Sequence, residues 1–365
     1  MDVRELARWR LRTLRLAGPG FGAPEEAVRW LGAVQSQDYG PAKWSIGIRC
    51  TGVRDADLER AYAEGTILRT HVLRPTWHFV LPEDIGWLLR ATAPRVQQLN
   101  AFMYRQQGLD ETVRERATDL IGDALRGGKS LTRKEIGAIL AAAGVDPGGL
   151  RLTLLVMHAE LEGVICSGPP RGAQHTYALL EERAPQARRL DRDAALAELT
   201  LRYFTGHGPA TAKDLAAWAS LTVAQVNRAL DLVSGHLQRL ELDGRTYWFA
   251  EPPPTRSTGP DVAYLLQGYD EYVMGYGETR YLMDTAGTAR PISDRPPYTL
   301  TLLFGPHVAG HWKRTLAKDA VTIHPALYAP LTATQRKALG AAADRYARFL
   351  SRSVTVAGAV TVAER

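Results

Sequence analysis

The sequence predicts a mixed α+β fold, in which three tandem winged-helix units precede a C-terminal β-barrel-like domain. Two observations support this prediction. The order of three helices and a two-stranded hairpin recurs three times, and the pattern then changes to short apolar strands. The length of 365 residues also exceeds what one compact core usually supports. We therefore expect domains at 1–82, 83–184, 185–254 and 255–365.

The first unit is expected to have helices at 3–16, 24–34 and 55–63 and strands at 67–73 and 76–80. Pro24 suits the first turn of the second helix, and Gly65 ends the third. The stretch 35–52 lies between these two helices, where a winged helix requires no extra sequence. We therefore expect this insertion to have a function.

The second unit is expected to have helices at 112–125, 132–144 and 150–162 and strands at 164–166 and 176–179. Thr132 and Glu135 have the spacing of a capping box, which marks the start of its second helix. The loop between the two strands contains Gly168, two prolines and Gly172, and is read as a wing.

The third unit is expected to have helices at 194–203, 212–219 and 222–233 and strands at 237–242 and 247–249. Thr222 and Gln225 form another capping box. Asp243-Gly244 is a strong signal for a two-residue hairpin turn between the strands.

The C-terminal region is expected to form a small barrel or sheet. One helix and five strands are predicted there, the helix at 334–350 and the strands at 262–267, 300–303, 308–313, 321–323 and 354–362.

Composition and charge narrow the function. The net charge is +6 and the pI is about 9.3, which suits phosphate binding, although codon bias in a GC-rich genome would also raise the arginine content. Neither a signal peptide nor a membrane-spanning apolar run is present, so a cytoplasmic protein is expected. The two cysteines exclude a paired-cysteine zinc cluster. Phosphate-binding loops and two-histidine metal motifs are also absent, so no metal or cofactor is expected.

Winged helices place one helix in the major groove and a wing on the DNA backbone. Three non-identical copies in one chain favour a monomer that offers one basic surface to a DNA duplex. The alternative is that at least one copy is purely structural.

The insertion contains the sequence Gln35-Ser36-Gln37. This motif and four further segments resemble the AlkZ/YcaQ superfamily of bacterial DNA glycosylases, and the resemblance covers nearly the whole chain. The four segments are 69–71, 74–80, 265–276 and 308–314. The resemblance implies three winged helices and a β-barrel arranged as a C-shaped DNA clamp. The family's catalytic motif falls on Gln35 and Gln37, as in the glutamine–glutamine, azinomycin-resistance-like branch. Ser36 is polar where an apolar residue is more usual, and Asp38 is one residue out of register for the aspartate of the other branch.

Two neutral amides suit a particular substrate. A purine alkylated at N7 or N3 is positively charged and leaves without protonation, so the enzyme needs only to hold a water and to stabilise an oxocarbenium-like sugar. We therefore expect a monofunctional DNA glycosylase of base excision repair that acts on alkylated purines, with bulky natural-product adducts and interstrand crosslinks as further candidates in a self-resistance role. The structural alternative is that Gln35 and Gln37 only cap the preceding helix.

Six other residues are candidate DNA contacts, namely Lys43, Arg74, Trp77, His78, Lys313 and Arg314. Lys43, the lysine closest to the motif, is either a phosphate contact or a solvated surface charge, and nothing marks it as a Schiff-base nucleophile. Trp77 is more commonly a core residue. Strand alternation places His78 on the opposite face from Trp77, where it would line the cleft. Lys313 and Arg314 either contact phosphates or occupy a solvated turn.

Two other functions remain open. A winged-helix transcriptional regulator would bind a specific sequence and be indifferent to damage. A damage-binding protein would need the same cleft without the chemistry. Under all three hypotheses the partner is double-stranded DNA. The favoured hypothesis, a DNA glycosylase, further predicts that this DNA carries alkylated purines and that the protein is located at the nucleoid.

Overall fold

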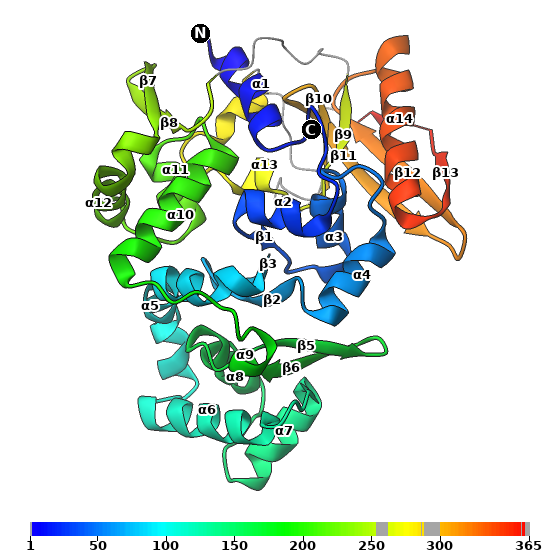
Figure 1. Cartoon of the computed structure of the whole chain (residues 1–365). Helices are drawn as coiled ribbons and strands as arrows, with labels where there is room; N and C mark the ends of the chain where they lie inside the picture. Colours follow the sequence, from blue (N-terminus) through cyan, green and yellow to red (C-terminus); the bar gives the residue numbers. More distant parts are fainter. Residues whose placement is uncertain (1, 253–261, 286, 288–299, 359, 362–365) are drawn as a thin grey trace.

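The computed structural model describes residues 2–252, 262–285, 287, 300–358 and 360–361. It is a mixed α+β protein in which the largest sheet is curled into a half-barrel (Figure 1). The described strands form four sheets, with the orders β1-β3-β2, β4-β6-β5, β7-β8 and β13-β12-β11-β10-β9, and β14 pairs with β12.

The N-terminal elements are α1 (Val3–Thr13), α2 (Pro24–Leu31), β1 (Val34–Gln35), α3 (Tyr39–Gly47), α4 (Asp55–Glu64), β2 (Leu68–His71) and β3 (Trp77–Val80). Helix α2 ends three residues before the predicted end, because Gly32 takes a positive φ of 78° and β1 begins at Val34. The insertion contains helix α3, which had not been predicted. Residues 42–47 of this helix are all buried, so it lacks the one-sided apolar pattern that signals a surface helix.

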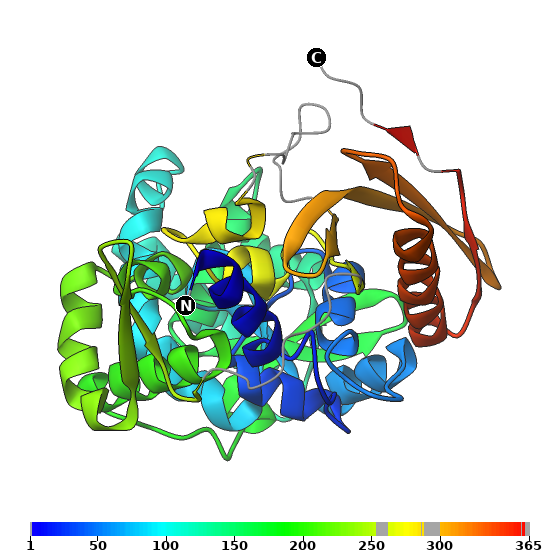
Figure 2. The ribbon, with the colours of Figure 1, turned by 90° about the horizontal axis from the view of Figure 1, so that it is seen from above.

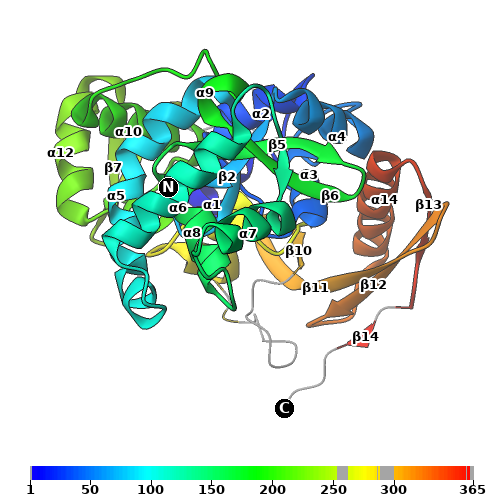
Figure 3. The same ribbon diagram turned by 90° about the horizontal axis from the view of Figure 1, so that it is seen from below.

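The middle of the chain forms α5 (Pro82–Gln106), α6 (Glu111–Leu125), β4 (Leu131–Thr132), α7 (Arg133–Ala142), α8 (Arg151–Leu161), β5 (Ile165–Arg171), β6 (Gln174–Leu179) and α9 (Leu180–Arg183). Thr132 and Glu135 form the predicted capping box. Helix α5 was missed, although it is 25 residues long, and it contains Pro94. Seen from below, α6, α7 and α8 lie in front of the N-terminal elements (Figure 3).

The next elements are α10 (Arg192–His207), α11 (Ala212–Trp218), α12 (Val223–Val233), η1 (Ser234–His236), β7 (Gln238–Leu242) and β8 (Arg245–Phe249). Thr222 and Gln225 cap α12 as predicted. Asp243 and Gly244 both have positive φ, 49° and 69°, as the predicted two-residue hairpin turn requires. The predicted boundary between 254 and 255 lies outside the described residues.

The C-terminal elements are β9 (Ala263–Leu265), α13 (Glu271–Met274), η2 (Arg280–Asp284), β10 (Thr301–Phe304), β11 (His307–Leu316), β12 (Ala320–Leu327), α14 (Ala333–Leu350), β13 (Ser353–Val356) and β14 (Val360–Thr361). The sheet curls around α14 (Figure 2). The single strand predicted at 354–362 is instead two strands, β13 and β14, which pair in parallel with different parts of β12.

Two large hydrophobic cores hold the molecule together. The larger core combines residues of all three predicted units, α5 included, with residues of the C-terminal sheet and α14. A separate core lies within residues 104–179. The glutamine pair therefore lies on a framework to which most of the chain contributes. The order of helices and hairpins agrees with the three predicted units, and their winged-helix interpretation stays a prediction.

Within the described residues, none of the helices combines the length and the apolar character needed to cross a membrane.

Candidate active site

Gln35 lies on strand β1, at the edge of a three-stranded antiparallel sheet. It pairs with His78 on β3, which in turn pairs with Thr70 on β2. Residues paired in this way share one face of a sheet, so Gln35, His78 and Thr70 form a cross-strand row. Trp77 and Phe79 point to the opposite face, as the alternation in the sequence predicted.

Gln35 is held at both its side chain and its backbone. Its side chain is only 3% exposed, and its Oε1 accepts a hydrogen bond of 2.9 Å from Nη2 of Arg74. Its backbone N–H points to Oε1 of Glu271 at 3.3 Å. Because the amide oxygen of Gln35 is occupied by Arg74, the amide N–H groups remain as the donors that this residue can offer.

Gln37 is exposed, and its position is set through the main chain. Arg69 donates to the carbonyl of Ser36 from Nε at 3.1 Å and from Nη2 at 2.9 Å, and it donates to the carbonyl of Gln37 at 3.3 Å. The backbone N–H of Ser36 donates to the carbonyl of Trp77 at 2.7 Å. The Gln37 side-chain oxygen is 3.4 Å from the Trp77 N–H, a long hydrogen bond that leaves this amide available.

Arg74 is the centre of the network. Besides Gln35, it donates to the carbonyl of Trp218 at 2.6 Å and contacts Nε2 of His78 at 3.1 Å. Nδ1 of His78 is 2.9 Å from the carbonyl of Thr76, which can only accept, so Nδ1 carries the proton and Nε2 accepts from Arg74. Burial, assisted by the charge of Arg74, holds the pKa of His78 well below its usual range. His78 is therefore a neutral acceptor.

Glu271 lies behind the glutamine strand and was not singled out as a site residue from the sequence. It is fully buried, and its Oε2 accepts from Nε1 of Trp218 at 2.8 Å and from Nε2 of His207 at 3.2 Å. Burial lowers the pKa of the Arg74 guanidinium, and the charge of Glu271 opposes that shift. The signal that could have found Glu271 is its place between the apolar segments 262–266 and 272–274, where a buried carboxylate requires partners.

The neighbouring Asp270 anchors the insertion to the C-terminal region. Both of its carboxylate oxygens accept from Arg49, at 2.7 and 2.8 Å, and the two side chains are fully buried. Burial would raise the pKa of Asp270, but the charge and hydrogen bonds of Arg49 outweigh it and leave the pKa lowered. This ion pair ties the end of α3 to the start of α13.

Aromatic and cationic side chains surround the exposed Gln37. The Arg69 guanidinium lies 4.4 Å from the Trp77 ring centroid, and the His71 ring lies 4.4 Å from Trp77 on the same face. Tyr39 contacts the ring of His175 at 4.6 Å. Trp77 is half-buried, so it combines the expected core character with an accessible edge. A partly exposed tryptophan is suited to contact with a nucleobase.

The other predicted contacts lie elsewhere. Lys43 is only 5% exposed, and its Nζ donates to Asp55 at 2.8 Å and also to Glu59, so its charge is compensated within the protein. Lys313 is exposed on β11, and the half-buried Arg314 next to it donates to the hydroxyl of Tyr346. The structure therefore groups Arg74, Trp77 and His78 with the glutamines and places Lys313 and Arg314 on the curled sheet.

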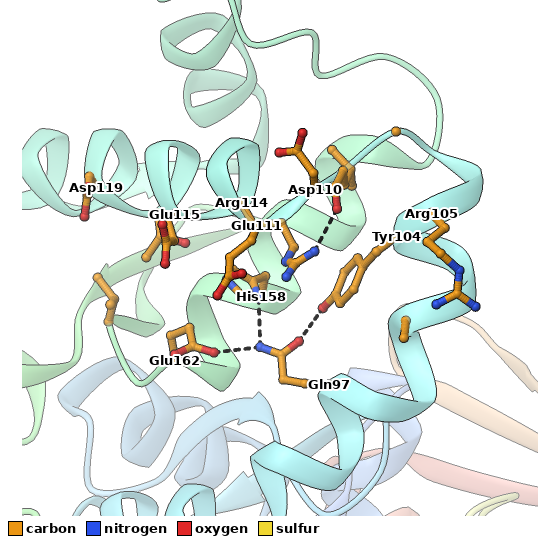
Figure 4. Close-up of a pocket in the computed structure, with 15 residues that line it drawn as sticks. Gln97, Tyr104, Arg105, Asp110, Glu111, Arg114, Glu115, Asp119, His158 and Glu162 are labelled. Carbon is orange, nitrogen blue, oxygen red and sulfur yellow. Dashed lines mark hydrogen bonds between the residues drawn. The ribbon is translucent and has the colours of Figure 1, made fainter.

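A cavity of 730 Å³ lies between α5, α6 and α8, apart from the glutamine pair (Figure 4). Gln97 is its hub: its Oε1 accepts from the Tyr104 hydroxyl at 2.6 Å, and its Nε2 donates to Glu162 at 2.8 Å and faces Nδ1 of His158 at 2.8 Å. These groups satisfy one another. The active-site assignment thus depends on the fixed glutamine motif rather than on this cavity.

Comparison with known proteins identifies the family and the fold. A sequence profile for a family described as "DNA glycosylase AlkZ-like" matches residues 28–349. The chain is 23% identical over 290 residues to an "Interstrand DNA cross-link repair glycosylase" from Streptomyces sahachiroi. The aligned region covers 75% of this chain and 77% of the relative. The solved structure of Streptomyces sahachiroi DNA glycosylase AlkZ superposes with a TM-score of 0.80 over 98% of this chain and 100% of that one, at 19% identity, and so has the same fold.

Proposed function

The chain belongs to the AlkZ-like DNA glycosylase family, and on that basis we propose that it hydrolyses the N-glycosidic bond of positively charged alkylated purines in duplex DNA. The observation that best supports this is the fixed orientation of Gln35, whose amide oxygen is bound by Arg74 at 2.9 Å. The amide N–H groups are thereby left to face a reactant.

The two amides have complementary roles in this proposal. Gln35 donates to the water oxygen, and the exposed Gln37 carbonyl oxygen accepts a proton of the same water. The water oxygen bonds to the anomeric carbon as the C–N bond breaks, and both electrons of that bond leave with the purine. The alkylated purine becomes neutral, and the proton lost by the water passes to solvent. Holding the water in this way removes part of its entropic cost.

No strong general base is required by this chemistry. His78 already accepts from Arg74 and carries its own proton on Nδ1, and Glu271 lies fully buried behind the backbone of Gln35. Lys43 is held in contacts with Asp55 and Glu59, so its amine is not free to attack a sugar carbon as a Schiff-base nucleophile. We therefore propose a hydrolytic, monofunctional reaction without strand cleavage.

The rest of the chain is proposed to bind DNA as a monomer in the cytoplasm, at the nucleoid, with the three winged-helix units and the curled sheet forming a clamp. Trp77 offers a stacking face beside Gln37, and Lys313 and Arg314 offer phosphate contacts. Because the curated relative is named for crosslink repair, bulky adducts and interstrand crosslinks are proposed substrates together with simple methylpurines.

The proposal is tested by single-turnover excision from a duplex that contains N7-methylguanine. Gln37→Ala is expected to slow base release about 10- to 1,000-fold, equivalent to ~1.4–4 kcal/mol of transition-state stabilisation. The abasic product should stay intact until heat or alkali is applied. Gln238→Ala, a change of an exposed glutamine on β7, serves as the matched control and should keep the wild-type rate.

Three results would contradict the proposal. A Gln37→Ala variant with the wild-type rate would remove the glutamine from the mechanism. Immediate strand breaks or a borohydride-trapped adduct would show lyase chemistry. Tight binding to the lesion without any base release would favour a damage-binding protein instead.

A further inference from the structure

A basic groove of 670 Å³ lies between the C-terminal ends of α3 and α14. Four arginines line it, and none of its lining residues is acidic; the arginines are Arg54, Arg345, Arg348 and Arg352. We call this feature the arginine groove. It lies apart from Gln35 and Gln37, and the proposed reaction does not use it.

Close packing of α3 against α14 brings these arginines together. The ring of Trp44 lies 5.1 Å from that of Phe349, and a Cβ added at Gly47 would lie only 2.4 Å from the Phe349 ring. After α14 the chain reverses at Ser351, which takes a left-handed φ of 54°. This reversal returns Arg352 to the groove.

The positive charge in the groove is only partly compensated within the described part of the chain: Arg54 interacts electrostatically with Asp57 but does not form an ion pair with it. Arg345 donates to the carbonyl of Ile48, and Arg54 reaches the hydroxyl of Ser351 at 3.5 Å. Neither these two nor Arg348 and Arg352 has a carboxylate within ion-pair distance there, and Nη1 of Arg352 is buried without any partner among the described residues. Burial lowers the pKa of Arg345, and the charges of Arg49 and Arg348 lower it further. The fold therefore holds like charges close together at a cost.

Helix capping explains only part of this arrangement. Basic side chains near a helix C-terminus stabilise its free carbonyls, which accounts for Arg345 and for Arg348 in the last turn of α14. Arg54, however, stands at the N-cap of α4, where the helix dipole disfavours a positive charge. Arg352 lies beyond the end of α14 and adds a further guanidinium to the groove. Because helix capping does not explain Arg54 and Arg352, these two residues point to an external anion.

Electrostatics connects the arginine groove to the glutamine motif. Burial lowers the pKa of Arg314; Asp55 and Asp38 oppose this shift, and Arg352 adds to it. Arg314 therefore lies within electrostatic reach both of Asp38, directly after Gln37, and of the groove. Helix α3 runs from the glutamine motif to the arginine groove. Its nine residues cover ~13 Å, which corresponds to about four base-pair steps along one DNA strand.

We propose that the arginine groove binds the sugar–phosphate backbone of the DNA, a few nucleotides away from the damaged base. Guanidinium groups match phosphate oxygens in geometry and charge, and the absence of acidic lining residues favours a polyanion. The inference depends on the proposed function in one respect, namely that the polyanion is DNA.

The test measures binding of undamaged duplex by anisotropy between about 50 and 200 mM salt. Arg348→Ala and the double variant Arg348→Ala/Arg352→Gln are compared with the wild type. Each lost phosphate contact is expected to reduce the slope of log affinity against log salt by about 0.9. The affinity should fall roughly two- to tenfold per contact, equally for damaged and undamaged duplex. Lys337→Ala, which removes an exposed charge near the other end of α14, is the matched control and should keep the wild-type slope.

A scan of single neutral methylphosphonate linkages locates the contact. On a duplex that contains N7-methylguanine, one or two positions a few nucleotides away from the lesion should weaken wild-type binding and have no effect on the Arg348→Ala variant. An unchanged salt slope together with a lower melting temperature would show that the arginines only cap helices, and would overturn the proposal. Because binding is measured on undamaged DNA, an altered slope without any base release by the wild type would refute the proposed reaction and leave the groove assignment standing.

Discussion

Arg74 fixes the orientation of the Gln35 amide. Its guanidinium joins three acceptors on three segments: the Gln35 side chain, Nε2 of His78 and the carbonyl of Trp218. A rotated amide would place an N–H donor against a guanidinium that can only donate. The orientation of Gln35 is therefore fixed before any substrate binds, which is the condition for preorganised catalysis.

Changing Arg74 should consequently affect the chemical step more than DNA affinity. Arg74→Lys keeps the charge but cannot reach three acceptors in one plane. We expect base release at saturating enzyme to slow about 10- to 100-fold, or ~1.4–2.8 kcal/mol. Single-turnover kinetics on N7-methylguanine duplex, with affinity measured separately, checks this prediction. A loss of affinity at an unchanged rate would instead make Arg74 a DNA contact.

Lys43 illustrates what a single sequence cannot show at this scale. Its partners Asp55 and Glu59 stand four residues apart on α4, a spacing that marks one helix face but does not identify the cation that faces it. Arg69 is similar. It lies on a predictable strand, yet its role in fixing the backbone of Ser36 and Gln37 depends on how β2 faces the insertion.

At the scale of elements, capping boxes and hairpin turns were predictable because their signals are local. Thr132, Thr222 and the Asp243-Gly244 turn all took the predicted roles. Helix α3 was not predictable, because it is buried on nearly all sides and its start contains Gly40 and Pro41. The sequence indicated that the insertion matters, and the tertiary structure shows why: α3 connects the glutamine motif to the curled sheet.

Gly47 is the closest point of contact between α3 and α14. An alanine Cβ there would meet the Phe349 ring at 2.4 Å, and Phe349 is only 3% exposed and cannot easily move. Gly47→Ala is expected to destabilise the protein by about 1–3 kcal/mol through overpacking, as measured by urea denaturation.

Gly340→Ala provides the opposite case. It also adds one methyl group, but to α14 at a position where the new Cβ meets nothing within 4 Å. Because alanine favours a helix over glycine, this change should stabilise the protein by ~0.5–1 kcal/mol. Equal effects of the two substitutions would contradict the close packing of α3 against α14.

At the scale of the whole molecule, the sequence predicted the fold class and the order of elements better than the distribution of the core. The four expected segments look separate along the chain, yet the larger core draws on all four of them together. Contacts such as that of the Trp44 indole N–H with the carbonyl of Leu265, at 2.6 Å, join positions 221 residues apart and leave no local pattern. The curled sheet in particular depends on such distant pairings.

The global stability of the protein should depend on pH through its buried histidines. Burial is the main cause of a lowered pKa at the buried His78 and His158 and at the half-buried His307. In the unfolded chain these groups take up a proton near pH 6.5, whereas the folded state resists protonation to a lower pH. Stability is therefore fully present above about pH 6.5 and is lost as the pH falls below that value. Carboxylates whose pKa is lowered, such as Glu135 with a pKa of about 2, act in the same direction but only below about pH 4.5.

His78 should contribute most clearly because it is completely buried. It is expected to account for up to ~1.4 kcal/mol of lost stability per pH unit below 6.5, until its folded-state pKa is reached. His78→Asn keeps a donor for the carbonyl of Thr76 but removes the titration. Urea unfolding at several pH values between 5 and 7 should therefore show a shallower pH dependence for this variant than for the wild type. His236→Asn, at a solvent-exposed histidine, should retain the wild-type dependence. If the His78→Asn profile instead runs parallel to that of the wild type, the protonation of His78 does not limit the stability of the fold in acid.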